Sequence, residues 1–217
     1  MSVKNNTKSY TIIVEGNIGS GKSTFLKNFL NNENISVLSE PLDDWEELLT
    51  LAYSDKTWTF TLQTLIHLTN LRTHEIQTGK PVKMMERSIY SARNVFMENY
   101  LNSNILSHYE FIVLDDWHKW LASKTEVGVD LIIYLRTDPE VAFERTKQRS
   151  RPGEEPITYD YIKNLHEYYE DWLCREKFEC PAFVLSLDAN KDLTEIKKEY
   201  IEKVTKLSNP HLTMTLY

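Results

Sequence analysis

A glycine-rich turn between a buried strand and a helix constrains this chain more than any other feature. Residues 16–23 read Gly-Asn-Ile-Gly-Ser-Gly-Lys-Ser, which satisfies the phosphate-loop pattern G-x4-G-K-[ST] at every required position. The run YTIIVEG at 10–16 is apolar and β-branched, as a buried strand should be, and residues 23–30 predict a helix. This strand, turn and helix predict an α/β fold of the P-loop NTPase type that binds a nucleoside triphosphate.

The chemistry of phosphate binding explains the composition of the turn. Glycines allow backbone N–H groups to approach phosphate oxygens, and the helix N-terminus adds a partial positive charge. Lys22 would act on the β- and γ-phosphates, and the Ser23 hydroxyl would ligate the Mg²⁺ that accompanies ATP. The predicted ATP-binding residues of this segment are Gly16, Asn17, Ile18, Gly19, Ser20, Gly21, Lys22, Ser23 and Thr24. The motif does not identify the acceptor of the phosphate.

Five strand patterns alternate with helical patterns along the chain. The strands are predicted at 10–16, 34–40, 81–88, 129–136 and 182–189, and the helices at 23–30, 43–53, 57–78, 89–101, 108–123, 139–148 and 159–178. Strands that alternate with helices need crossover connections, which predicts a parallel five-stranded sheet with helices on both faces. No linker or internal repeat divides the sequence, so we expect a single domain over 1–217.

Composition disfavours several classes of protein. The net charge is −7, whereas a protein that grips nucleic acid through its phosphates usually carries a basic face, so we expect no nucleic-acid partner. No apolar run of about 18 residues predicts a membrane span. Residues 1–10 are polar and lack the patterns of secretory and organellar leaders, which favours the cytoplasm. The two cysteines, Cys174 and Cys180, fit neither a disulfide framework nor a zinc site.

Four further segments complete a distinctive ordered set. They are Glu40-Pro41 followed by Trp45, then Thr61-Leu62-Gln63-Thr64, then Glu86-Arg87-Ser88 with Ala92 and Phe96, and finally Arg149-Ser150-Arg151-Pro152-Gly153-Glu154-Glu155 leading into Tyr161. Together with the phosphate loop, the set resembles the deoxyribonucleoside kinases of the mitochondrial thymidine kinase, deoxycytidine kinase and insect multisubstrate type. The resemblance runs from about Tyr10 to about Ala189 and implies ATP-dependent 5′-phosphorylation of deoxyribonucleosides.

The resemblance implies a role for each charged residue of the set. Glu40 would be the general base that takes the 5′-hydroxyl proton, and Arg87 would hold the 5′-oxygen and the transferring phosphoryl group beside Lys22. Glu86 would join Ser23 around Mg²⁺. The cations of an arginine-rich lid over the triphosphate would be Arg145, Arg149 and Arg151.

The resemblance also implies a pocket for the nucleoside. Gln63 would pair with a pyrimidine edge, because its amide offers a donor and an acceptor. Trp45 and Phe96 would sandwich the base, and Tyr53 and Glu154 would hold the 3′-hydroxyl. The remaining predicted contacts are Leu49, Leu62, Ile66, Asn70 and Ala92.

Three of these positions set base preference in the family. Ala92 resembles the thymidine-accepting members, and Ile66 suits the methyl group of thymine. Asn70 departs from the family pattern, which has Met or Arg at this place. We therefore expect thymidine and deoxycytidine to be good substrates, and the acceptance of purine deoxynucleosides stays open.

Two other functions stay open on the sequence. A nucleoside monophosphate kinase of the thymidylate type shares the phosphate loop, but it would need an extra cation for the acceptor phosphate where this chain has Glu40. A non-catalytic kinase-like subunit could tolerate the loss of Lys22, Glu40 or Arg87, and all three are present. Family members are usually dimers, which implies a homodimer formed through the helices predicted at 89–101 and 108–123.

Overall fold

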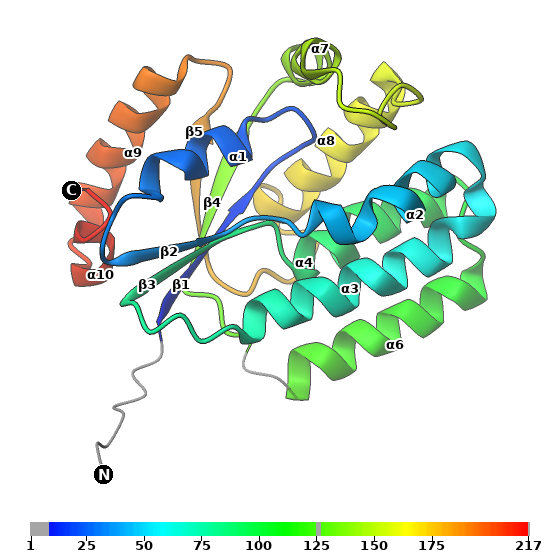
Figure 1. Ribbon diagram of the computed structural model, residues 1–217, viewed down its shortest axis with the longest axis horizontal. Helices are drawn as coiled ribbons and strands as arrows, with labels where there is room; N and C mark the ends of the chain where they lie inside the picture. Colours follow the sequence, from blue (N-terminus) through cyan, green and yellow to red (C-terminus); the bar gives the residue numbers. More distant parts are fainter. Residues whose placement is uncertain (1–8, 125–126, 217) are drawn as a thin grey trace.

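The computed structural model describes residues 9–124 and 127–216. Its centre is a five-stranded sheet in the order β2-β3-β1-β4-β5, in which all neighbouring strands are parallel. The strands are β1 Tyr10–Glu15, β2 Ile35–Leu38, β3 Val82–Glu86, β4 Leu131–Arg136 and β5 Phe183–Asp188. The predicted parallel α/β fold is confirmed, and the strand before the phosphate loop lies in the middle of the sheet (Figure 1).

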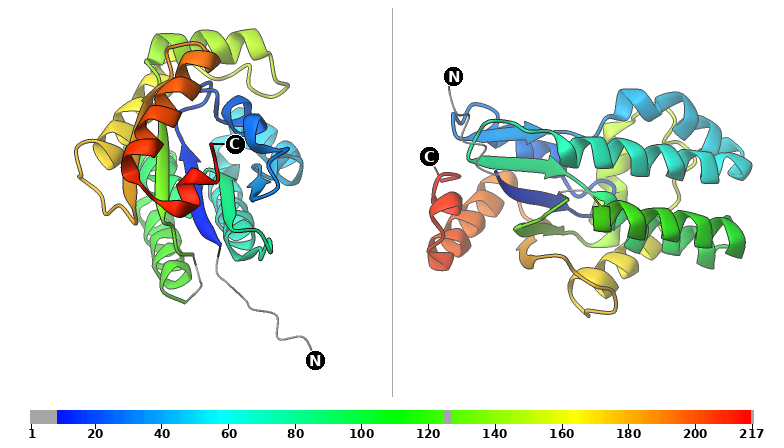
Figure 2. Two further views of the ribbon diagram at one scale, coloured as in Figure 1. Left: turned by 90° about the vertical axis from the view of Figure 1, so that its left-hand side faces the viewer. Right: turned by 90° about the horizontal axis from the view of Figure 1, so that it is seen from below.

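Helices cover both faces of the sheet, with α1 and α9 on one side and α8 on the other (Figures 1 and 2). The helices are α1 Lys22–Leu26, α2 Leu42–Ser54, α3 Thr59–Glu75, α4 Ile89–Ser91, α5 Glu98–Asn102, α6 His108–Lys124, α7 Pro139–Arg149, α8 Tyr159–Leu173, α9 Leu193–Leu207 and α10 Pro210–Thr213. Short 3₁₀ turns lie at η1 Lys27–Phe29 and η2 Lys56–Trp58, and a π-helical segment, η3, spans Ala92–Met97. Among the helices of the described residues, none has the length and apolar character that a membrane span requires.

The side chains of β1 alternate between two hydrophobic cores. Ile12 packs in a core with Phe25 of α1 and Tyr200 of α9, whereas Ile13 packs in a core with Trp172 of α8. Both isoleucines are fully buried. A parallel sheet covered on both faces produces strands that read as continuous apolar runs, and β1 and β4 are such strands.

Several predicted helices differ from the observed ones in their bounds. The helix predicted at 23–30 is α1 followed by a 3₁₀ turn, and the one predicted at 57–78 is a 3₁₀ turn followed by α3. The helix predicted at 159–178 ends at Leu173, because the Glu170 carbonyl accepts from the N–H groups of both Cys174 and Arg175. Glu176 then adopts a φ of 55°, which takes the chain out of the helical direction.

Helix α9 lies beyond the last predicted element, which ends at residue 189. The Asp192 side chain caps it by accepting from the N–H groups of Thr194 and Glu195. Its apolar residues recur at every fourth position and are buried: Ile196, Tyr200 and Val204. The cap and this spacing are the signals that would have predicted the helix.

Two buried histidines and one half-buried histidine lie where α3 meets α6 and α4. His67 and His74 lie on α3 and His118 lies on α6, and the ring centroids of His67 and His118 are 5.9 Å apart. Nδ1 of His67 carries a proton because it lies 2.8 Å from the carbonyl oxygen of Gln63. Among the described residues, Nε2 of His67, Nδ1 of His118 and both ring nitrogens of His74 have no hydrogen-bond partner. Burial lowers the pKa of His67 and of His118 to about 4, and that of His74 to about 3.

We expect acid to destabilise the fold through these histidines. In the unfolded chain they take up protons near pH 6.5, but in the folded chain they resist protonation until about pH 4 or below. Their contribution to stability is therefore present above pH 6.5 and is lost as the pH falls, at about 2 kcal/mol for each histidine between pH 7 and pH 5. Glu15 acts with the opposite sign, because burial raises its pKa to about 7 and the folded chain takes up that proton first.

The His74→Phe variant isolates one histidine, because phenylalanine keeps the ring contact with Tyr90 and cannot be protonated. Denaturant unfolding at pH 7 and pH 5 should show a smaller loss of stability for this variant than for the wild type. His108→Phe, at an exposed position, serves as the control and should keep the wild-type loss. Equal losses in His74→Phe and the wild type would contradict the role given to His74.

Candidate active site

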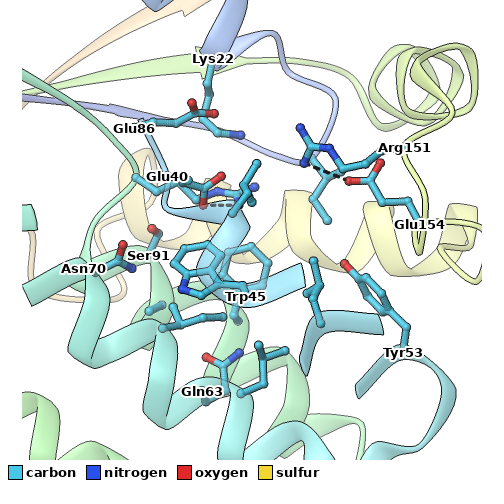
Figure 3. Close-up of a pocket in the computed structure, with 18 of the residues that line it drawn as sticks. Lys22, Glu40, Trp45, Tyr53, Gln63, Asn70, Glu86, Ser91, Arg151 and Glu154 are labelled. Atoms are coloured by element: carbon cyan, nitrogen blue, oxygen red, sulfur yellow. Dashed lines mark hydrogen bonds and ion pairs between the residues drawn. The ribbon is translucent and has the colours of Figure 1, made fainter. Parts of the chain in front are cut away.

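A pocket opens beyond the carboxyl ends of β1, β2 and β3. It is at this edge that open parallel sheets bind their ligands. Every residue predicted to contact the nucleoside lines it: Glu40, Trp45, Leu49, Tyr53, Leu62, Gln63, Ile66, Asn70, Arg87, Ala92, Phe96 and Glu154. The lining also includes Ile18, Gly19, Lys22, Ser23, Glu86, Arg149 and Arg151, so predicted donor and acceptor residues share one cavity (Figure 3).

The phosphate loop lies tightly between β1 and α7. Gly19 has a φ of 77°, and a Cβ there would lie 2.1 Å from the carbonyl oxygen of Ala142 on α7, so only glycine fits. The Lys22 ammonium donates to the carbonyl oxygens of Gly16, at 3.0 Å, and Asn17, at 2.8 Å. Burial and the charge of Arg87 lower the pKa of Lys22 to about 8. A bound triphosphate would favour the charged form of this lysine.

Ser23 and Glu86 bring two oxygen ligands together at the edge of the pocket. The Ser23 hydroxyl donates to Oε1 of Glu86 at 2.8 Å, across the space between α1 and the end of β3. Within the described residues no group of three or more potential metal-ligating side chains occurs. Mg²⁺ in nucleotide sites needs only one or two protein ligands, because water and phosphate oxygens complete its shell. This donor pair therefore fits magnesium held together with a triphosphate.

Arg87 and Glu40 form an ion pair at the centre of the pocket. The distance from Nη1 of Arg87 to Oε1 of Glu40 is 2.9 Å, and only 13% and 7% of the two side chains is exposed. Arg87 has a φ of 59°, a conformation that costs a non-glycine residue about 1 kcal/mol. Its N–H donates to the carbonyl oxygen of Val14 at 3.0 Å, and its guanidinium lies 4.9 Å from the centroid of the Phe96 ring. These contacts hold the strained residue in one position.

Behind Arg87 lies a buried carboxylate that the sequence prediction missed. Glu15, the last residue of β1, is fully buried, and its Oε1 accepts from the Ser88 hydroxyl at 2.7 Å. Its Oε2 accepts from the Tyr169 hydroxyl on α8 at 3.4 Å. Ser88 also caps α4, accepting from the N–H groups of Tyr90 and Ser91. Glu15 thus connects the strand before the phosphate loop to the segment after Arg87 and to α8. The sequence feature that could have predicted its role is an acidic residue within an apolar strand.

Gln63 offers unused hydrogen-bonding capacity at the opposite end of the pocket from the phosphate loop. Its side chain is 1% exposed, and its Oε1 has no partner among the described residues. Figure 3 shows its amide directed into the cavity beneath the ring of Trp45. Nε1 of Trp45 donates to the Thr69 hydroxyl at 2.9 Å, which fixes the orientation of this ring. A buried amide oxygen without a partner costs about 1 to 3 kcal/mol, and a ligand that donates to it recovers that loss.

Asn70 lines the same pocket and lies beside Ser91 in Figure 3. It is buried, and its Nδ2 donates to the carbonyl oxygen of Ser88 at 3.4 Å. Part of its hydrogen-bonding capacity is therefore taken up by the backbone next to Arg87.

The arginines of the predicted lid differ in where they point. Arg149 is the last residue of α7, one residue beyond the predicted helix, and its Nη2 donates to both carboxylate oxygens of Glu154 at 2.8 Å. Arg151 donates to the same carboxylate at 3.4 Å. Arg145 points elsewhere: its guanidinium donates to the carbonyl oxygens of Ala189, Asn190 and Lys191, and it does not line the pocket. Its part in ATP binding stays a prediction.

Four pocket residues were absent from the predicted site: Leu42, Ser91, Tyr100 and Tyr161. The hydroxyls of Tyr100 and Tyr161 lie 3.1 Å apart on the wall formed by α5 and α8. Tyr161 follows the motif at 149–155, and this position in the sequence could have indicated that it belongs to the site. Nothing in the local sequence distinguishes Tyr100 from a core tyrosine.

Comparisons with known proteins identify the family of the chain. Residues 12–212 match the family described as deoxynucleoside kinase. "Thymidine kinase 2, mitochondrial" from Macaca fascicularis is 37% identical over 210 residues, which cover 94% of this chain and 79% of the relative. The protein of the same name from Homo sapiens has the same identity and coverage. "Deoxycytidine kinase 2" from Gallus gallus is 33% identical over 231 residues, covering 88% of this chain and 86% of the relative. These matches confirm the predicted resemblance.

We expect Ser88→Ala to impair both stability and turnover. The substitution removes the closest donor to the buried Glu15 and the cap of α4, so the free energy of unfolding should fall by about 1 to 3 kcal/mol. It also loosens the segment next to Arg87, so kcat should fall more than KM rises. Ser54→Ala, an exposed serine bonded to a helix carbonyl, is the control. If Ser88→Ala lowers the melting temperature but keeps the wild-type kcat, the claim that Glu15 supports the active site is contradicted.

Proposed function

The chain belongs to the deoxynucleoside kinase family, and we propose that it transfers the γ-phosphate of ATP to the 5′-hydroxyl of deoxyribonucleosides, with pyrimidines preferred. The observation that carries this proposal is the content of one pocket. It brings the phosphate-loop lysine Lys22, the Arg87–Glu40 pair and the unpartnered amide of Gln63 into a single cavity. A donor end and an acceptor end that meet at a carboxylate suit phosphoryl transfer to a hydroxyl group.

Glu40 and Arg87 would act on the reacting atoms. Glu40 would take the proton of the 5′-hydroxyl as its oxygen bonds to the γ-phosphorus and the bond to the β-phosphate oxygen breaks. The products are ADP and the deoxyribonucleoside 5′-monophosphate. Arg87 and Lys22 would neutralise the charge that develops on the transferring group, because both cations are buried where water screens them little.

Mg²⁺ would be held by Ser23 and Glu86, whose oxygens already lie within hydrogen-bonding distance. When bound with ATP, the ion supplies positive charge to the phosphate oxygens. The chain's own part is to present the Ser23 hydroxyl from α1 and the Glu86 carboxylate from the end of β3, one residue before Arg87. Glu86 and Arg87 would thus offer a metal ligand and a cation from neighbouring backbone positions.

The base-binding end suits a pyrimidine in two respects. Gln63 can donate and accept along one base edge, and Trp45, held by its bond to Thr69, offers a flat face for stacking. Ala92 and Ile66 leave an apolar surface next to Asn70. We propose thymidine and deoxycytidine as the preferred acceptors.

The alternatives are less well supported by the site. A nucleoside monophosphate kinase needs a cation for the acceptor phosphate, but Glu40 occupies that place and is paired with Arg87. A non-catalytic subunit would have no need of the complete set of Lys22, Glu40 and Arg87. A single domain over 1–217 and a cytoplasmic location stay predictions.

We also propose that the enzyme is a homodimer joined through α6. This helix exposes a stripe of large apolar side chains: Tyr109, Ile112, Val113, Trp117 and Trp120. Two symmetry-related copies of the stripe can cover each other, and aromatic residues are enriched in such interfaces. The helix predicted at 89–101 was also expected to contribute, but it carries none of the large exposed apolar residues found in the described part of the chain.

The Glu40→Gln variant tests the proposed reaction. The amide keeps the size of the side chain but cannot take the hydroxyl proton, so kcat with Mg·ATP and thymidine should fall by about a hundredfold. Glu46→Gln, at an exposed position on α2 outside the pocket, is the matched control and should keep wild-type kinetics. Retention of most of the activity in Glu40→Gln would remove this residue from the mechanism.

The Trp117→Glu variant tests the dimer. A charge in the centre of the stripe should convert a dimer to a monomer in sedimentation velocity experiments. Trp58→Glu places the same charge on another exposed tryptophan, in the turn before α3, and should leave the dimer intact. A monomeric wild type, or equal behaviour of both variants, would contradict the role of α6.

A further inference from the structure

The loop after α7 is held to the end of that helix through Glu154. The side chain of Glu154 is 8% exposed, and its carboxylate accepts from Arg149 and Arg151 of the same segment. Under the proposed function these two arginines move to the triphosphate when ATP binds. Glu154 then loses both partners, so its position beside the pocket needs a second attachment.

That second attachment is a close contact between Gly153 and Thr50 of α2. Gly153 has a φ of 82°, and a Cβ at this position would lie 2.8 Å from Oγ1 and 3.8 Å from Cβ of Thr50. The three atoms nearest to such a Cβ all belong to Thr50. The Thr50 hydroxyl donates to the carbonyl oxygen of Glu46 at 2.9 Å, so its oxygen is held in place. The backbone of the loop can approach α2 this closely only because residue 153 has no side chain.

Helix α2 carries part of the nucleoside pocket. Leu49 immediately precedes Thr50, and Tyr53 follows it by three residues, and both line the cavity. Burial raises the pKa of Tyr53, and the nearby charge of Glu154 acts in the same direction. Figure 3 shows the Tyr53 hydroxyl and the Glu154 carboxylate on the same side of the pocket. The contact with Thr50 thus sets where Glu154 lies relative to Tyr53.

We propose that Gly153 and Thr50 are positioning residues, which seat the loop on α2 so that Glu154 faces the 3′-hydroxyl of the nucleoside beside Tyr53. The inference rests on the proposed function and adds a determinant of sugar recognition to it. The contact between Gly153 and Thr50 does not involve the two arginines. It therefore keeps Glu154 in place, and free to accept from the 3′-hydroxyl, after the triphosphate has drawn the arginines away.

A double-mutant cycle on thymidine phosphorylation tests the contact. Gly153→Ala alone should lower kcat/KM for thymidine at least tenfold, because the new methyl group collides with Oγ1 of Thr50. In the Thr50→Ala background the nearest atom to that methyl group is at 3.8 Å, an ordinary contact, so the added substitution should cost less than threefold. Strain from the positive φ is the same in both backgrounds and cannot produce this difference. Equal losses in both backgrounds would overturn the proposal.

Two further kinetic measurements test what the contact between Gly153 and Thr50 does. Gly153→Ala should barely change kcat/KM for 3′-deoxythymidine, which lacks the hydroxyl that Glu154 would hold; a tenfold loss with this substrate would overturn the sugar role. Gly79→Ala is the matched control, because Gly79 has a φ of 70° with nothing within 4 Å of an added Cβ, and its kinetics should stay at wild-type values.

The same measurements separate this proposal from the proposed function. Wild-type protein that does not phosphorylate thymidine would overturn both, whereas active wild type with equal losses in the cycle would overturn only the positioning role. If Gly153→Ala does not fold, Thr50→Leu enlarges the other side of the contact without backbone strain. It should give the same loss with thymidine and spare 3′-deoxythymidine, and unchanged kinetics with thymidine would again overturn the proposal.

Discussion

The ion pair between Arg87 and Glu40 is the interaction around which the site is built. The two side chains follow β3 and β2, which are neighbours in the sheet, so parallel pairing brings their carboxyl ends together. Arg87 reaches Glu40 from a left-handed backbone position that hydrogen bonding to β1 and ring contact with Phe96 hold in place. A hydrogen-bonded cluster centred on the buried Glu15 holds Ser88, the residue after Arg87.

The pocket divides into a charged end and an apolar end, and their order follows from the sheet. The phosphate loop and Glu86 come from the central strands β1 and β3, whereas Trp45 and Gln63 come from α2 and α3, which extend beyond the sheet (Figures 1 and 3). A ligand that fills the cavity must therefore be anionic at one end and flat with polar edges at the other. Among the described residues that line the cavity, the cations are Lys22, Arg87 and the two lid arginines, Arg149 and Arg151.

The sequence predicted what local patterns encode. The strands β1 and β4 are near-continuous apolar runs because they are buried on both faces of the sheet, and the phosphate loop and Gln63 stand in contiguous motifs. Glu15 and Tyr100 were missed because their importance arises from contacts with residues far away in the chain, such as Tyr169 and Tyr161. The pairing of Glu154 with the lid arginines could not be predicted either, because the side chains of a charged loop are usually solvated.

The most direct test of the account is to identify the acceptor. The protein is incubated with Mg·ATP labelled in the γ-phosphate in five separate reactions. Each reaction contains one acceptor, either one of the four deoxyribonucleosides or thymidine monophosphate. The account predicts labelled 5′-monophosphates of thymidine and deoxycytidine, and no diphosphate from thymidine monophosphate. Labelled diphosphate from thymidine monophosphate, with both pyrimidine nucleosides left unchanged, would contradict it.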